Sequence, residues 1–562
     1  MAKTGDGGDT VAEVLSTAGV DTIMSMAGGH VTSIFEAVPE EKIRSVVFRD
    51  ERAAGFAAAA WGALTRKPGV CLVTAGPGLT NAVTGLAQAQ RSGWPVISIA
   101  GAFEVFSQDR GGLQEMAQSE FMAPISKWSR TVSDPRRIGE YVERALQAAT
   151  TPPYGHAHLS IPVDLLSLAI PDRPQKREPD EYLGHTLGGL SETAIARITE
   201  ELKGAERPVL IAGPGVWFAD GQDALRRFVE KTGMPTFTHE EARGLLSDEH
   251  PCCVGEILYR LSGAVRCLER ADVVVVVGCN PDWRLEYLDP PLVSEGVKVV
   301  LIDSNPEHLV MTRPTSVRAC ADEANALAML ATVLPDSNAR WDAWRGEMKA
   351  AQQEHRRNVL EKEPAAHPDR AVPAVTVVRL VAEACIRDDA NVVFDGGNTG
   401  KWGKLVVPAT RPGQWNRVKG PFASIGHGLP SAIARRLSDP SHPCVLYTGD
   451  GSFGYHVAEV ETAVREGADL TAVILIDGAW GSVQEMQFKR FGGLEGTLIP
   501  RTRFDQAATA LGAKGYWIED AESLEGLLAE PHEGVRVVCV NTETAFPPIQ
   551  YPPGRYARGD DA

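Results

Sequence analysis

Short apolar runs alternate with longer amphipathic stretches along most of the chain. The short runs have the length of buried strands, and the stretches between them repeat apolar residues every three or four positions, as helices do. This alternation predicts an α/β fold built on parallel sheets. The expected strands span residues 22–26, 45–48, 70–74, 96–100, 158–161, 209–212, 273–277, 299–302, 444–447 and 470–476.

Two stretches interrupt the alternation and divide the chain into three blocks. Residues 172–188 are rich in proline and charge, which is typical of a linker, and residues 335–372 read as an exposed helix followed by a second linker. We therefore predict three doubly wound parallel-sheet domains, over residues 1–172, 190–335 and 370–547. The tail, residues 548–562, is expected to be an arm or a lid.

The third block contains the stretch around which the rest is organised, GDGSFGYHVAEVETAVREGADLTAVILIDGAW at residues 449–480. One strand runs into Gly449-Asp450-Gly451 and a second ends at Asp477. A right-handed strand–helix–strand unit places both carboxyl ends on one sheet edge, so we expect the two aspartates side by side.

Two adjacent carboxylates suit a hard cation such as Mg²⁺, which usually keeps phosphate in its shell. Gly451 allows close approach of the backbone, and Ser452 is expected to begin a helix whose N-terminus favours phosphate. The stretch thus predicts a metal–diphosphate site. A crossover with two capping aspartates would explain a lone GDG turn better.

The first block offers three further candidates. His30 follows a Gly-Gly pair after a strand, Glu51 opens an Ala-rich helix, and residues 73–89 form a strand, a Gly-rich turn and a helix. Taken singly, each has an ordinary explanation: a solvated loop histidine, a glutamate that satisfies the helix dipole, and a weak phosphate-binding turn.

Together these pieces resemble the thiamine diphosphate enzymes, in the family's domain order and over most of the chain. The family's motif opens with GDG and closes with paired asparagines, where this chain has Ile476-Asp477. The resemblance implies pyrimidine-binding, central and diphosphate-binding domains, with Mg²⁺ held by Asp450, Asp477 and the carbonyl of Ala479. It assigns the cofactor to Glu51, Asn398, Thr399, Ile425, Gly449, Asp450, Gly451, Ser452 and Asp477.

The resemblance also implies roles for these side chains. Glu51 matches the glutamate that hydrogen-bonds the aminopyrimidine ring and starts the proton relay within the cofactor. Ile425 matches the bulky residue that keeps the cofactor bent, although taken alone it reads as core packing. The family's sites lie between two subunits, so we expect a homodimer or homotetramer with the active site at the dimer interface.

Within the superfamily of acetolactate synthases, benzaldehyde lyase and 2-hydroxyacyl-CoA lyases, the pocket segments 28–35 and 123–128 are most similar to benzaldehyde lyase. Gln114 matches the family's active-site glutamine, and with His30 it suits carboligation or its reverse. We therefore expect a carbon–carbon lyase or carboligase acting on 2-oxo acids, aldehydes, 2-hydroxy ketones or acyl-CoA equivalents. An acetolactate synthase-like transferase with flavin in the central domain, and a non-catalytic protein that kept the fold, stay open.

The composition limits the kinds of partner that the protein is expected to bind. A net charge of −17 argues against nucleic acid and anionic membranes, and no apolar run reaches the length of a membrane span. Nine scattered cysteines and an N-terminus unlike a signal peptide favour the cytoplasm. We expect the central domain to be purely structural. The alternative is that it binds flavin, ADP or CoA at the ends of its strands.

Overall fold

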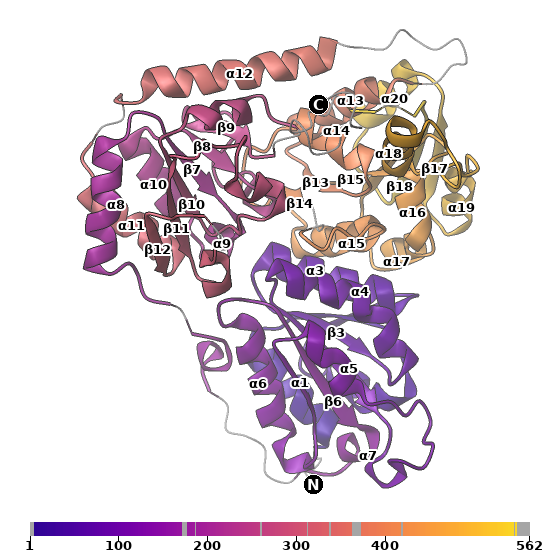
Figure 1. Cartoon of the computed structure of the whole chain (residues 1–562). Coiled ribbons are helices and arrows are strands. Elements are labelled where there is room, and N and C mark those ends of the chain that lie inside the picture. Colours follow the sequence, from indigo (N-terminus) through magenta and orange to yellow (C-terminus); the bar gives the residue numbers. More distant parts are fainter. Residues whose placement is uncertain are drawn as a thin grey trace.

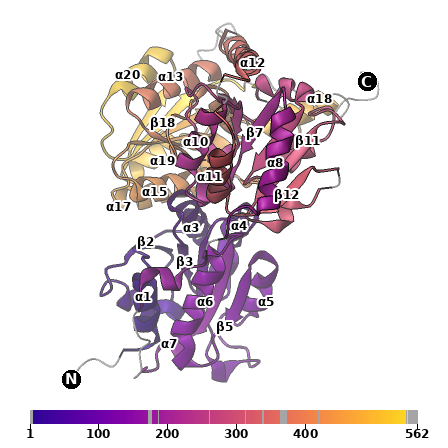
Figure 2. The same ribbon diagram turned by 90° about the vertical axis from the view of Figure 1, so that its left-hand side faces the viewer.

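The computed structural model describes residues 5–170, 177–185, 187–258, 261–311, 313–336, 339–361, 372–416, 420–544 and 546–547. Three six-stranded sheets are flanked by helices, and the strands within each sheet run parallel (Figures 1 and 2). This arrangement confirms the predicted class of three α/β domains. The predicted tail, residues 548–562, lies outside the described residues.

The first sheet has the order β2-β1-β3-β4-β6-β5. Its strands are β1 (Thr22–Ser25), β2 (Arg44–Val47), β3 (Gly69–Val73), β4 (Val96–Ala102), β5 (Trp128–Thr131) and β6 (His156–Pro162). Its helices are α1 (Gly7–Thr17), α2 (Thr32–Ala37), α3 (Glu51–Thr65), α4 (Pro77–Ser92), α5 (Gln118–Met122), α6 (Ile138–Thr150) and α7 (Val163–Leu166).

The second sheet has the order β12-β11-β10-β7-β8-β9, which is the strand order of dinucleotide-binding folds. Its strands are β7 (Pro208–Ala212), β8 (Thr236–Thr238), β9 (Cys253–Glu256), β10 (Val273–Val277), β11 (Lys298–Asp303) and β12 (Val317–Cys320). Its helices are α8 (Glu192–Gly204), α9 (Pro214–Phe218), α10 (Gln222–Thr232) and α11 (Glu323–Val333). The long helix α12 (Asp342–Glu361) then runs along the top of this domain toward the third (Figure 1).

The third sheet, ordered β14-β13-β15-β16-β18-β17, repeats the pattern of the first. Its strands are β13 (Asn391–Phe394), β14 (Trp415–Asn416), β15 (Cys444–Gly449), β16 (Thr471–Ile476), β17 (Lys514–Ile518) and β18 (Arg536–Asn541). Its helices are α13 (Ala374–Arg387), α14 (Asn398–Val406), α15 (Gly428–Ser438), α16 (Asp450–Phe453), α17 (Glu459–Arg465), α18 (Gly481–Phe491), α19 (Phe504–Ala510) and α20 (Ala521–Ala529).

The Ala-rich helix α3 joins the first domain to the third. Asp50 caps its N-terminus by accepting a hydrogen bond from the Arg52 amide, and residues 53–64 are buried. Small side chains let it pack closely on α4, where a Cβ at Gly55 would lie 2.7 Å from the Ala82 carbonyl. Helix α15 of the third domain packs on α3 from the other side (Figure 1).

Each sheet has a point where the strand order reverses, between β1 and β3, between β7 and β10, and between β13 and β15. In parallel sheets, the loops at the carboxyl ends of the strands flanking this point open a crevice where ligands bind. Among the candidate residues, His30 follows β1, Asn398 and Thr399 follow β13, and Asp450 follows β15, so the fold brings them to two of these crevices. Glu51, Gln114 and Asp477 follow the neighbouring strands β2, β4 and β16.

Two sequence expectations need correction. The helix of the GDG turn begins at Asp450, not Ser452, and is a single turn that is followed by a 3₁₀ turn and then α17. Strand β5 was not expected, because its sequence, WSRT, has no apolar run and its last two residues are exposed.

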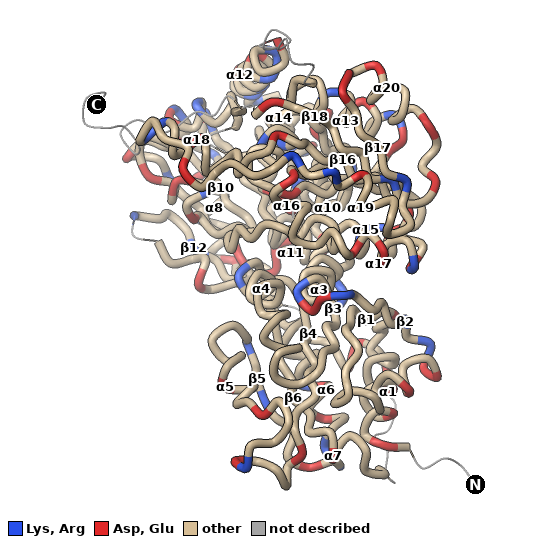
Figure 3. The backbone as a smooth tube through the Cα atoms, turned by 90° about the vertical axis from the view of Figure 1, so that its right-hand side faces the viewer, with Lys and Arg blue, Asp and Glu red and all other residues tan. Residues whose placement is uncertain are grey.

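Charged residues of both signs are interspersed over the molecule (Figure 3). Among the described residues, none of the helices combines the length and the apolar character that crossing a membrane requires.

Candidate active site

Asp450 and Asp477 lie side by side at the edge of the third sheet, as the strand–helix–strand unit predicts. The Asp450 carboxylate accepts hydrogen bonds from the amides of Gly451 and Gly478, both at 2.8 Å, and so reaches across to the loop after β16. Asp477 accepts one from the Ala479 amide at 3.2 Å.

Burial raises the proton affinity of both carboxylates. Burial, together with the Asp450 charge, raises the pKa of Asp477 to about 7, and burial raises the pKa of Asp450. Among the described residues there is no group of three or more His, Cys, Asp or Glu that could hold a metal. A cation at the pair would therefore complete its shell with backbone carbonyls, water and a ligand such as diphosphate, which is how Mg²⁺ is usually bound.

Three loops close around this pair too tightly for further side chains. A Cβ at Gly451 would lie 2.6 Å from the Trp480 ring, and one at Gly397 would lie 2.4 Å from the Ser482 side chain. A Cβ at Gly449 would lie 3.0 Å from the Thr399 hydroxyl, and a Cβ at Gly396 would lie 3.2 Å from the Ser452 hydroxyl. Loops 396–399, 449–452 and 477–482 thus form one cradle.

The cradle contains an unsatisfied donor. The Asn398 side-chain nitrogen is buried and has no hydrogen-bond partner. A buried donor without a partner is unfavourable, so an anion such as a diphosphate oxygen fits there. The residues present are therefore compatible with a diphosphate and its metal ion.

Ile425 lies in the irregular segment before α15 and is half-buried. Its neighbour Gly426 has a φ of 85°, and a Cβ there would lie 2.7 Å from the Tyr455 side chain. The Ser424 hydroxyl donates a hydrogen bond to Gln88 of the first domain. This segment is therefore held at the boundary between the first and third domains.

In the first domain, the turn of residues 74–78 brings the other candidates together. His30 is 8% exposed, so it is not a solvated loop residue, and its Nδ1 lies 3.0 Å from the Thr74 hydroxyl. Just beyond the turn, in the first turns of α4, the Asn81 side-chain amide donates a hydrogen bond to the Glu51 carboxylate at 3.0 Å. A Cβ at Gly78 would lie 3.5 Å from the Glu51 carboxylate.

Gln114 meets the middle of the same turn. Its carbonyl oxygen would lie 2.9 Å from a Cβ at Gly76, and its backbone φ is 59°, a strained value outside glycine. Its side-chain oxygen is buried without a partner. Gln118 holds the turn in place, because its side chain accepts from the Gly76 amide at 2.7 Å and donates to the Gly101 carbonyl at 3.0 Å.

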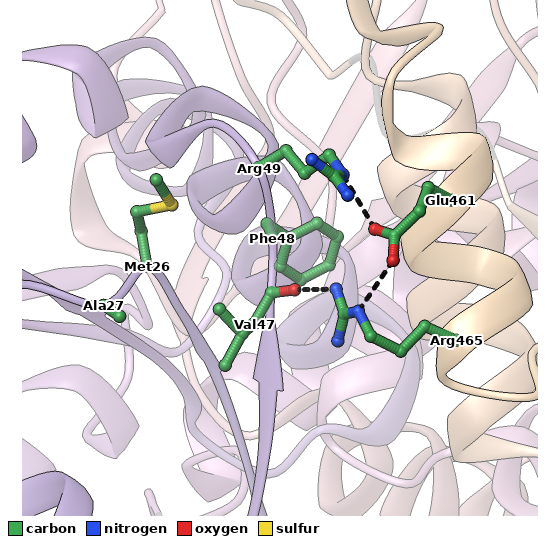
Figure 4. A pocket seen from close by; sticks show the side chains of 7 residues that line it. All are labelled: Met26, Ala27, Val47, Phe48, Arg49, Glu461 and Arg465. Carbon is green, nitrogen blue, oxygen red and sulfur yellow. Dashed lines mark hydrogen bonds and ion pairs between the residues drawn. The ribbon is translucent and has the colours of Figure 1, made fainter. Parts of the chain in front are cut away.

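The segment before Glu51 is anchored by the third domain of the same chain. The amide of Arg49 donates to Glu459 at 3.1 Å, and its guanidinium donates to Glu461 at 2.7 Å. Arg465 donates to the other oxygen of Glu461 at 3.1 Å and to the Val47 carbonyl at 2.5 Å (Figure 4). A cavity of about 450 Å³ beside these groups is lined by Met26, Ala27, Val47, Phe48, Arg49, Glu461 and Arg465.

Helix α14, which begins at Asn398, is anchored on the central domain by a buried ionic cluster. The Lys404 ammonium lies 3.2 Å from Glu240 and 2.7 Å from Glu256. Arg284 pairs with the other oxygen of Glu240 at 2.6 Å. All four side chains are at most 7% exposed, so the cluster ties the cofactor-side helix to the second sheet.

A second cavity, of about 520 Å³, lies where the second sheet reverses its order. It is lined by the loops after β7, β10 and β11, including Gly215, Gly278 and Asp303, and by residues of the first domain such as Arg91 and Tyr154. An acidic residue at the end of such a strand can bind ribose hydroxyls.

Sequence reasoning missed the partners of the candidate residues. Thr74 and Asn81 lie within the Gly-rich stretch already singled out, but only the fold shows that they contact His30 and Glu51. Lys401, which donates to Asn398, directly follows the loop assigned to the diphosphate. A search of each motif for polar residues within one helical turn would have found all three.

Three family models match the chain in succession. They are the N-terminal TPP binding domain, the central domain and the C-terminal TPP binding domain of thiamine pyrophosphate enzymes, at residues 5–121, 195–330 and 395–542.

Curated relatives match nearly the whole length. A probable acetolactate synthase of Mycobacterium bovis is 30% identical over 98% of both chains. A 2-hydroxyacyl-CoA lyase of Arabidopsis thaliana is 27% identical over 95% of both, and human 2-hydroxyacyl-CoA lyase 2 is 30% identical over 91% of this chain and 84% of its own. With the two crevices described above, these matches show that the chain belongs to the thiamine pyrophosphate enzymes.

Proposed function

We propose that this enzyme is a thiamine diphosphate- and Mg²⁺-dependent carbon–carbon lyase or carboligase. Its substrates would be 2-oxo acids, aldehydes, 2-hydroxy ketones or acyl-CoA equivalents. The supporting observation is the gathering of His30, Gln114 and Glu51 around one turn, where the side-chain oxygen of Gln114 is buried without a partner. That set can move a proton and orient an oxygen, which is what making or breaking a 2-hydroxy ketone requires.

Thiamine diphosphate, when bound, supplies a carbon nucleophile and an electron sink. Asp450, Asp477 and the Ala479 carbonyl would hold the Mg²⁺ ion, and Asn398, Thr399 and Ser452 would surround the diphosphate. Glu51, steadied by Asn81, would hold a proton at the pyrimidine ring. Ile425 would support the bent shape of the bound cofactor.

His30 and Gln114 would contact the substrate. Thr74 occupies Nδ1 of His30, so Nε2 is the nitrogen available to exchange a proton with a substrate hydroxyl. The unpaired side-chain oxygen of Gln114 would accept a hydrogen bond from the same substrate.

We further propose that two copies of the chain form each active site, in a homodimer or homotetramer. Among the described residues, no hydrogen bond joins Glu51 or Asn81 to Asp450 or Asp477. Large apolar side chains are exposed on both halves of the site, on residues 105–121 and on 483–498, as expected of surfaces that pack on a partner. They are Val105, Phe106, Leu113, Phe121, Val483, Met486, Phe488, Phe491, Leu494 and Leu498.

An acetolactate synthase-like transferase with flavin in the central domain is the second candidate. The order of the second sheet and its cavity of about 520 Å³ favour it, because both suit an adenine nucleotide. Flavin absorbance in the purified protein would support this candidate. A colourless protein would support the lyase. A cytoplasmic location stays a prediction from the sequence.

The decisive test is a substrate panel. Purified protein with thiamine diphosphate and Mg²⁺ is incubated with 2-oxo acids, aldehydes and acyl-CoAs, singly and in pairs, and the products are identified by mass spectrometry. We expect new or cleaved carbon–carbon bonds that depend on the cofactor, with activity lost in His30→Ala. Cofactor binding with no turnover of any pair would contradict the proposal.

A further inference from the structure

Lys401, in the first turns of α14, joins the two loops that flank the cofactor cradle. Its ammonium lies 3.0 Å from the Asn398 side-chain oxygen, 3.2 Å from the Ser482 hydroxyl and 3.3 Å from Glu485. The side chain is 23% exposed. Asn398 comes from the loop after β13, whereas Ser482 and Glu485 belong to α18, directly after the Asp477 loop.

The ammonium determines which way the Asn398 amide points. An ammonium group only donates hydrogen bonds, so the amide must turn its oxygen toward Lys401 and its nitrogen away. That nitrogen is buried without a partner. It lies 3.3 Å from the point where a Gly481 Cβ would stand, and the Asp477 carboxylate lies 3.2 Å from the same point. The N–H groups are therefore directed into the cradle beside Asp477.

Charge gives Lys401 a second effect. Asp477 places a carboxylate where the related motif has an amide, so this cradle carries one more negative charge beside the diphosphate. Glu485 is buried nearby and adds another carboxylate. Lys401 pairs with Glu485 at 3.3 Å and is bonded to Asn398, so its positive charge offsets part of the total negative charge around the cradle.

We infer that Lys401 is a positioning residue for the diphosphate: it orients the Asn398 amide toward the cofactor and offsets the charge that Asp477 adds. The inference rests on the proposed cofactor site and deepens it. Lys401 itself need not contact the diphosphate. Its effect should therefore appear in cofactor affinity before it appears in catalysis.

The test is a binding measurement on the full-length protein. Replacing Lys401 by methionine keeps the length of the side chain and removes the ammonium. Thiamine diphosphate affinity is measured at saturating Mg²⁺ by quenching of tryptophan fluorescence, since the Trp480 ring lies against Gly451 in the cradle. We expect binding to weaken by about ten- to a hundredfold, the range for losing a hydrogen bond from a charged donor.

Lys489→Met is the matched control. Lys489 bonds the other oxygen of Glu485 at 2.7 Å from the solvent side and is 51% exposed. The Lys489→Met variant removes a positive charge from the same carboxylate. We expect its cofactor affinity to stay within about twofold of the wild-type value, because exposed ion pairs contribute little. An equal loss in both variants would overturn the specific role of Lys401.

The charge effect has its own test. In the double variant Lys401→Met, Asp477→Asn, we expect cofactor binding to recover in part relative to Lys401→Met alone, because the charge that needed compensation is gone. Lys401→Leu, which also removes the donor and the charge, replaces Lys401→Met should the latter unfold. Wild-type affinity in Lys401→Met or Lys401→Leu would overturn this inference alone, whereas a wild-type protein that binds no thiamine diphosphate would overturn the proposed function.

Discussion

Replacing Asp477 by asparagine should stabilise the metal-free protein, and the gain should depend on pH. Burial and the neighbouring Asp450 raise the pKa of Asp477 from 3.8 to about 7. Between these values the folded chain holds a proton that the unfolded chain has released, so stability falls as pH rises through this window. Above pH 7 the carboxylate is charged, and its burial beside Asp450 costs about 4 kcal/mol, at about 1.4 kcal/mol for each pH unit of the shift.

The assay is urea unfolding in the presence of EDTA, at pH 8 and at pH 5. We expect Asp477→Asn to exceed the wild type by up to about 4 kcal/mol at pH 8 and by less than half of that at pH 5, because the wild-type side chain then keeps its proton. Thiamine diphosphate affinity with Mg²⁺ should not fall by as much as about tenfold, since asparagine keeps an oxygen ligand.

Asp505→Asn is the control of opposite sign. Arg503 pairs with Asp505 at 2.7 Å and lowers its pKa, so losing this charge should destabilise the protein at pH 8. If Asp477→Asn were no more stable than the wild type at pH 8 while Asp505→Asn lost stability, the account of the aspartate pair would be wrong.

Three further predictions address other parts of the account. Glu51→Gln should lower kcat at least about a hundredfold, as expected for losing a proton-transfer group, while the exposed Glu120→Gln leaves it unchanged; equal rates would refute the relay. Lys404→Met should cost about 3–5 kcal/mol in urea unfolding because it leaves the buried Glu256 carboxylate without its cation, and adding Glu256→Gln should recover part of it; no loss would refute the anchoring cluster. Phe491 is 67% exposed, and Phe491→Asp should shift the protein toward monomer in sedimentation. Ile386→Asp, at a residue 56% exposed, should leave the oligomer unchanged. An unchanged oligomer in Phe491→Asp would exclude this surface from the interface.

The sequence predicted best those features that depend on local pattern. The sequence predicted both ends of strand β10 correctly. This strand consists of five consecutive valines, and a buried parallel strand is apolar on both faces. The pairing of Asp450 with the Asp477 loop followed from the handedness of one crossover. Neither inference needed contacts between distant parts of the chain.

Features set by tertiary packing could not be predicted in this way. Strand β5 is polar and forms only because it pairs with β6. The helix expected between the GDG turn and the next strand is interrupted, because α17 begins only at Glu459, and its residue Val464 is 37% exposed. The contacts of His30 with Thr74 and of Lys401 with Ser482 join residues 44 and 81 positions apart, which periodicity does not report.

The central claim is that Glu51 of one copy and Asp450 of another serve the same cofactor. Glu51→Gln and Asp450→Asn are each purified, mixed, dissociated in mild denaturant and reassembled, and the activity of the mixture is measured against each variant alone. We predict recovery of about a quarter of wild-type activity, because about half of the dimers are mixed and each carries one intact site of two. A mixture no more active than the separate variants, although mass spectrometry shows mixed dimers, would contradict the claim.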